Sequence, residues 1–219
     1  MSRRGACVAS LTLAALVAMP VAAPAARHRG RCAMPGRTVL RTSLIRVVRV
    51  EDTAGESVTM SGCAFATNRV FELASGVQAD TTDTSLGLDR HSGTWVGVST
   101  STQNQYGFSG ATRVTNVRNG RGYTLTSYTV GLGEPGPGTS LVKYGINDRG
   151  QAAAAFQDNS TAPNQPPRAA ATRIVAVSSN GTQRLVDFGA PADLPASSLQ
   201  LDRKLFIWTH SGQLRYAWL

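Results

Sequence analysis

A serine and a lysine stand at the spacing used by one class of serine acyl enzymes. Ser140 and Lys143 form the motif S-x-x-K, in which one helical turn places the lysine beside the nucleophilic hydroxyl. Here the motif lies in a segment with the composition of a β-strand, where residues three apart point to opposite faces. Neither K-T-G nor S-D-N follows it, so we interpret the match as chance.

The histidines and the grouped aspartates give no stronger indication of catalysis or metal binding. No G-x-S-x-G elbow is present and spacing assembles no triad, so we expect ordinary surface histidines. Asp80, Asp83 and Asp89 offer oxygens of the kind that bind Ca²⁺, but a turn and a strand entry explain the first two. We therefore predict no catalytic residue, no metal and no cofactor. The histidines concerned are His28, His91 and His210.

Two loops that carry paired amides are the best candidates for a binding site. An aromatic ring can stack on a ligand while an amide offers both donor and acceptor, which suits carbohydrate or peptide. The loops are predicted at 99–110 and 158–170, and the first adds two aromatic residues. The alternative is that both loops are merely long, which the short turn at 210–212 supports. The candidate binding residues are Asn104, Gln105, Tyr106, Phe108, Asn164 and Gln165.

These loops belong to an internal repeat, which decides the fold class. The pattern S-L-x-L-D-R-x4-W occurs at 85–95 and again at 198–208. A second pattern, N-Q-x5-A-T-R followed by Val or Ile, occurs at 104–114 and 164–174, an offset of 60 residues. The two patterns interleave, so they mark successive copies of one structural unit. Within the first pattern we expect Asp89 and Arg90 to form a turn, and Trp95 and Trp208 to lie in the core.

Each unit consists of short segments rich in β-branched and aromatic residues and bounded by turn residues, a composition typical of antiparallel strands. Units with successive segments of this kind begin at Ser85, Ser140 and Ser198. The sequence therefore predicts an all-β, propeller-like fold of roughly four small antiparallel blades. In this prediction the segment IRVVRV at 45–50 completes the C-terminal blade. A β-sandwich and an incomplete propeller that closes by forming a homodimer are the alternatives.

The N-terminal residues indicate export. Arg3 and Arg4 precede an apolar segment at 8–21, and Ala23-Pro24-Ala25 has the small residues of a cleavage site. We predict a signal peptide at 1–25, a basic N-terminal arm at 26–43 and a single β-repeat domain at 44–219. A membrane anchor is the alternative, but it needs about 20 apolar residues. Outside the signal peptide the cysteines are Cys32 and Cys63, and such a pair in an exported protein predicts one disulfide.

Positive charge is concentrated near the N-terminus. Seven arginines between 27 and 49 precede the carboxylate of Glu51, whereas from Val50 onward 13 basic residues balance 13 acidic ones. Such an arm could hold the protein to an anionic wall polymer or lipid surface through salt-sensitive contacts. The alternative is a solvated leader without a partner. The neutral body argues against nucleic acid as the partner.

Three motifs, taken in order, connect the chain to known sequences. They are the S-G-C strand at 61–63, I-N-D-R-G-Q at 146–151, and S-L-x-L followed by W-T-x-x-G-x-x-R-x-A-x-L at the end. Together they resemble a group of uncharacterised exported proteins of high-GC Gram-positive bacteria. The resemblance implies a propeller-like β-repeat fold and export, and it carries over no catalytic residue.

Two functions of different classes are consistent with this sequence. The first is an exported, non-catalytic binding or interaction protein, secreted or wall-associated, whose partner is an envelope polymer, a glycan or a protein. The alternative is a propeller-type hydrolase or lyase whose residues gather on the axis from different blades. A pocket with converging polar residues at the axis would favour the enzyme.

Overall fold

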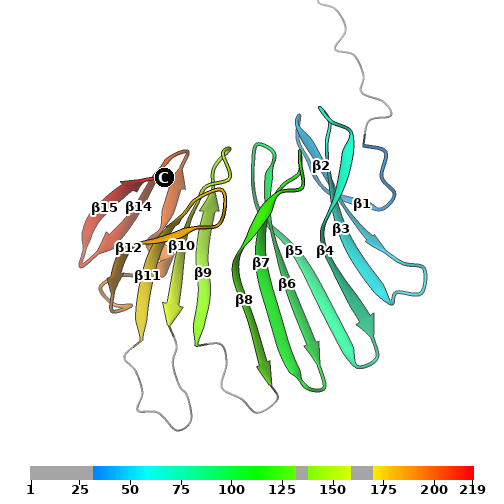
Figure 1. The fold of residues 1–219 in the computed structure, drawn as a ribbon. Helices are drawn as coiled ribbons and strands as arrows, with labels where there is room; N and C mark the ends of the chain where they lie inside the picture. Colours follow the sequence, from blue (N-terminus) through cyan, green and yellow to red (C-terminus); the bar gives the residue numbers. More distant parts are fainter. Residues whose placement is uncertain (1–31, 132–137, 159–169) are drawn as a thin grey trace, which may run out of the picture.

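The computed structural model describes residues 32–131, 138–158 and 170–219, which fold mainly as antiparallel β-strands. We divide the strands into four sheets in chain order, and they follow one another in a row from sheet 1 to sheet 4 (Figure 1). Sheet 1 contains β1 (Arg37–Arg41), β2 (Ile45–Glu51), β3 (Ser57–Ala64) and β4 (Arg69–Ala79), and sheet 2 contains β5 (Thr82–Ser92), β6 (Trp95–Asn104), β7 (Gly107–Asn116) and β8 (Gly122–Gly131). Sheet 3 contains β9 (Thr139–Ile146), β10 (Ala152–Asp158), β11 (Ala171–Val177) and β12 (Gln183–Gly189), and sheet 4 contains β13 (Gln200–Asp202), β14 (Leu205–His210) and β15 (Gln213–Trp218).

Sheets 1 and 2 are joined at one corner. β4 and β5 pair only at Gln78 with Asp83 and at Ala79 with Thr82, beside their connecting turn. The eight-stranded sheet therefore divides at this corner, and its two halves pack against each other around Met60 of β3.

The strand β10 shows how the sheets are stacked. All four side chains of Ala152–Ala155 are fully buried, because successive residues of a strand point to opposite faces and both faces are covered. Ala154 packs in one cluster with Trp95 of sheet 2, and Ala155 packs in another with Phe206 of sheet 4. Sheet 3 is therefore enclosed between its neighbours, and the small side chain of alanine allows both of them to approach.

The predicted disulfide is confirmed. Cys32 and Cys63 are bonded, with their Cα atoms 5.6 Å apart. They form a buried cluster with Met34 and Val48 on the face of sheet 1 that points away from sheet 2. The segment before β1 thus covers the outer face at this end of the row.

The all-β class is confirmed, and the sheets do not close into a barrel. Each strand predicted in the units beginning at Ser85, Ser140 and Ser198 is present, although those of the first unit are longer than predicted. The predicted place of IRVVRV is wrong: β2, which contains it, pairs with β1 and β3 in sheet 1. Pairing between neighbouring segments closes a much shorter loop than pairing across the whole chain, and so costs less entropy.

Two smaller expectations also need correction. β1 was not predicted as a strand, and it lies inside the segment 26–43 that was expected to be a basic arm. Asp89 and Arg90 do not form a turn, because β5 continues to Ser92 with an irregularity in its register between Leu88 and Arg90. Trp95 and Trp208 are buried, as expected.

The described ranges contain no helix that is both long and apolar enough to span a lipid bilayer. The predicted signal peptide at 1–25 lies outside the described residues.

Candidate functional site

The tip of the β6–β7 hairpin carries the most exposed aromatic side chain among the large hydrophobic residues described. Tyr106 is 75% exposed. Its backbone N–H donates to Oδ1 of Asn104 at 2.9 Å, so this amide shapes the turn. Gly107 follows with φ +146°, and a Cβ there would lie 2.0 Å from the carbonyl oxygen of Val130. This position therefore requires glycine, and the turn holds Tyr106 outward in a fixed place.

The aromatic surface extends from the tip along β7. Phe108 is 38% exposed, and its ring meets that of Tyr128 on β8 edge to face, with centroids 6.0 Å apart. Gln105 is exposed beside Tyr106. The structure thus brings Asn104, Gln105, Tyr106 and Phe108 together, whereas Asn164 and Gln165 lie outside the described residues.

The loop predicted at 99–110 is mostly strand. β6 and β7 remain paired up to Asn104 and Gly107, so the polar segment forms a long ribbon with a tight turn. The polar composition of this segment led to the wrong prediction of a loop. An antiparallel ribbon can expose its side chains to water while its backbone groups stay paired.

The strand ends of sheet 3 form the same edge of the molecule as this turn (Figure 1). There, Nη2 of Arg173 on β11 donates to Oδ1 of Asp158 on β10 at 2.9 Å and to Thr139 on β9 at 3.3 Å. Thr139 in turn donates to Asp158 at 2.7 Å. This network ties three neighbouring strands together, so the edge is held rigidly where the chain enters and leaves sheet 3.

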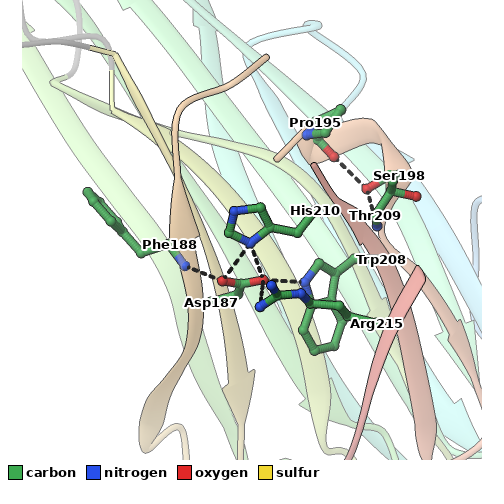
Figure 2. Close-up of polar contacts among 8 residues, drawn as sticks. All are labelled: Asp187, Phe188, Pro195, Ser198, Trp208, Thr209, His210 and Arg215. Carbon is green, nitrogen blue, oxygen red and sulfur yellow. Dashed lines mark hydrogen bonds and ion pairs between the residues drawn. The ribbon is translucent and has the colours of Figure 1, made fainter. Parts of the chain in front are cut away.

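A second polar arrangement lies between sheets 3 and 4, where three side chains converge on the carboxylate of Asp187 (Figure 2). The indole Nε1 of Trp208 donates to Oδ2 at 2.6 Å, and Nδ1 of His210 lies 2.9 Å from the same oxygen. Arg215 lies 3.7 Å from it, and the backbone N–H of Phe188 donates to Oδ1 at 2.9 Å. We call these residues the Asp187 cluster.

The electrostatics of this cluster favour an ionised aspartate. Burial alone raises the pKa of Asp187, but the hydrogen bonds from Trp208, His210 and the backbone of Phe188 outweigh it and hold the pKa below its usual range. In the neutral tautomer whose Nδ1 donates to the aspartate, Nε2 of His210 is an acceptor, which is the orientation of a general base. Within the described ranges, however, no hydroxyl donates to that nitrogen. The cluster therefore joins two sheets, and no hydroxyl or thiol in the described part of the chain is hydrogen-bonded to its histidine.

This cluster was not predicted from the sequence, and His210 was expected to be an ordinary surface residue. The side chain of His210 is only 18% exposed. The alternation of Trp208 and His210 along β14 places both on one face, which is the only local signal, and Asp187 comes from another unit of the repeat.

A shallow groove runs over the first strands of sheets 2, 3 and 4. Arg90, His91, Lys143 and Gln200 line it. Nζ of Lys143 donates to the carbonyl oxygen of Ser197 at 2.8 Å, and Nε of Arg90 donates to that of Tyr144 at 3.3 Å. The ionisable side chains lining this groove are cationic or neutral, and the two longest are already bound to backbone carbonyls.

The S-x-x-K motif lies in a strand, as expected, but its two side chains are arranged differently from the prediction. Lys143 pairs with Ala155 whereas Leu141 pairs with Phe156, so Val142 is an extra residue in β9. This irregularity places Ser140 and Lys143 on the same face, contrary to the prediction. Ser140 donates to the carbonyl oxygen of Gln157 and Lys143 to that of Ser197, so both side chains are bound to backbone groups.

The three aspartates considered as a calcium site have different structural surroundings. Oδ2 of Asp89 accepts from the hydroxyl of Tyr144 on sheet 3 at 3.2 Å, and Oδ1 accepts from Ser99 at 2.9 Å. Asp80 lies in the turn between β4 and β5, and Asp83 lies in β5, where it pairs with Gln78. In the part of the chain that the structure describes, no three His, Cys, Asp or Glu side chains are grouped as metal ligands would be.

Comparisons with family models and with curated proteins found no relative of this chain. No protein-family model matches the chain, and no curated protein matches it.

Proposed function

We infer that the four sheets are the blades of an incomplete, propeller-like fold. Three observations support this: each sheet is an antiparallel meander in chain order, successive sheets pack face to face, and β9 contacts both β5 and β13. The first strands of sheets 2, 3 and 4 therefore line the inner side of the row, as first strands do in propellers.

We propose that the protein is an exported, non-catalytic binding module of the cell envelope, secreted or wall-associated, that binds glycan or peptide at the edge carrying Tyr106. The observation that carries the proposal is the exposed ring of Tyr106, held outward by a turn that the chain stabilises with Asn104 and Gly107. A rigid aromatic side chain loses little conformational entropy on binding. Disulfide bonding agrees with an oxidising compartment.

Co-sedimentation with isolated peptidoglycan, and titration with soluble chito-oligosaccharides, tests this proposal. We expect Tyr106→Ala to weaken binding about tenfold, which is the loss of one stacking contact. Leu185→Ala is the matched control, because Leu185 is also well exposed, at 56%, but lies in β12 away from the turn. Equal binding by wild type and Tyr106→Ala would reject this edge as the site.

The alternative, an enzyme with an axial site, has the inner groove as its only candidate among the described residues. Hydrolases and lyases need a general base or a metal-activated water. The groove offers Arg90, His91 and Lys143, and the two longer side chains are engaged by backbone carbonyls. This composition favours binding over hydrolysis, and turnover by purified protein in an esterase, lactonase and glycosidase panel would reverse the conclusion.

A further inference from the structure

The outer face of sheet 4, which points away from sheet 3, is apolar. Phe206 and Trp208 of β14 pack against sheet 3, so the residues that alternate with them point the other way. Strand pairing places these beside alternate residues of β15. We call this surface the outer face; its members are Leu205, Ile207, Thr209, Leu214, Tyr216 and Trp218.

This face is unusually exposed for its composition. Leu214 is 73% exposed, Tyr216 69% and Trp218 64%. Fully burying an aromatic side chain removes roughly 150 to 250 Å² from water. These three side chains alone therefore expose a few hundred Å², about the size of the largest apolar patch on a typical monomer. The face carries little charge: on β13, Asp202 and Gln200 are opposite Leu205 and Ile207.

The corresponding faces of the other sheets are all covered. The face of sheet 1 around Met60 is buried by sheet 2, that of sheet 2 around Val114 by sheet 3, and that of sheet 3 around Ile174 by sheet 4. At the opposite end of the row, Cys32 and Met34 cover sheet 1. Within the described residues, the outer face of sheet 4 is the place where this mode of packing continues without a partner sheet.

We propose that a second copy of the chain covers this face, the two outer faces packing on each other about a two-fold axis. A two-fold contact joins a surface to itself, so it requires a patch without strong net charge, and this face meets that condition. The face also has the aliphatic and aromatic composition by which the chain's own sheets pack. A glycan site would place amide, hydroxyl or charged groups directly beside the rings. Here the direct cross-strand neighbours of Tyr216 and Trp218 are Ile207 and Leu205, and the polar Gln200 and Asp202 lie one strand further away.

The exposed apolar side chains, a few hundred Å² in all, are large enough to form the centre of a dimer interface. A standard interface buries about 800 Å² per partner, and Tyr216, Trp218 and Leu214 would form its apolar centre, where most binding energy is concentrated. The proposal goes beyond the function proposed above and uses a different surface, so loss of glycan binding and loss of the dimer are separate results.

Trp218 provides a direct reporter for the test. The chain has three tryptophans; Trp95 and Trp208 are only 8% and 4% exposed, against 64% for Trp218. Acrylamide should therefore quench Trp218 selectively. Sedimentation velocity and quenching of the purified protein would be measured across roughly 1 to 100 µM. We expect dimerisation and, over the same concentrations, loss of acrylamide access.

Variants then locate the interface. Tyr216→Ser and Leu214→Ser should each weaken the dimer at least tenfold while the circular dichroism melt stays unchanged, since both side chains are exposed. Phe188→Ser is the matched control, because Phe188 is 56% exposed on β12 and should leave the dimer intact. A monomer at every concentration would overturn the proposal, as would a dimer in which Trp218 stays accessible, because strands paired edge to edge leave this ring in water. Binding of chito-oligosaccharide that shields Trp218 in a monomer would assign the face to glycan instead.

Discussion

At the scale of single residues, hydrogen bonds from polar side chains supplement the apolar contacts between sheets. The hydroxyl of Tyr123 on β8 donates to the carbonyl oxygen of Gly150 at 2.8 Å, and Tyr144 donates to Asp89. Both tyrosines have a raised pKa, chiefly because burial disfavours the phenolate. Asp187 is the opposite case, since its partners stabilise the charged form. Each contact fixes the relative position of two sheets, which apolar packing alone specifies less sharply.

Asp187→Asn should destabilise the protein, by roughly 1.5 to 3 kcal/mol at neutral pH, the typical value of hydrogen bonds to a charged group. Because the folded pKa of Asp187 is lowered, its contribution is present above the unfolded pKa of about 3.9 and is lost as pH falls through the folded value. Chemical denaturation at pH 7 and near pH 3 checks this. The difference between wild type and Asp187→Asn should shrink at the lower pH, and the exposed Asp202→Asn should show no such difference. A gap that stays constant with pH would mean that the charge of Asp187 is not what stabilises the cluster.

At the scale of elements, β10 determines the spacing of the stack. Its four alanines have neighbours on both faces, and the adjoining sheets supply the large residues, Trp95 on one side and Phe206 on the other. Large side chains on one sheet that face small ones on the next fill the space between two sheets at the usual separation of about 10 Å. The run of alanines in the sequence is therefore a consequence of packing between sheets.

Ala154→Leu should accordingly destabilise the protein by about 1 to 3 kcal/mol, the usual cost of overpacking a tight core. Ala154 is fully buried, whereas Val142, on the adjacent strand β9, is 45% exposed. Val142→Leu is therefore the control and should be nearly neutral. Urea denaturation measures both. Equal and small effects would show that sheets 2 and 3 can separate without cost.

The repeat made most strands predictable, but it did not fix which strands pair with each other. Segment boundaries follow from composition and turn residues, and for this reason the strands from β5 to β15 were found. The place of β2 could not be predicted, since a buried β-strand has the same pattern in sheet 1 as in sheet 4. Tyr106 could be identified from the sequence because its turn is formed by residues adjacent in the chain. The residues of the Asp187 cluster come from β12, β14 and β15, which belong to two units of the repeat, and sequence spacing does not show that they meet.

At the scale of the whole molecule, the row of sheets has two different ends (Figure 1). The Cys32–Cys63 disulfide covers one end, and the apolar face of sheet 4 forms the other. Each sheet packs mainly on its sequence neighbours, so stability resembles a sum of contacts between adjacent units, as in repeat proteins. Loss of a contact at one end should then act mainly on that end.

Removing the disulfide tests this. Cys32 and Cys63 are 31 residues apart, for which chain entropy predicts a loss of about 3 to 4 kcal/mol on opening the loop. We expect a protein with both cysteines replaced by serine to show faster amide exchange in β2 and β3 and little change in β14 and β15, because two sheets separate these strands from the altered end. Reduced wild type is the control for the substitutions themselves. Exchange that rises equally in all four sheets would show instead that the row unfolds as one cooperative unit, in which the ends are coupled through every interface between them.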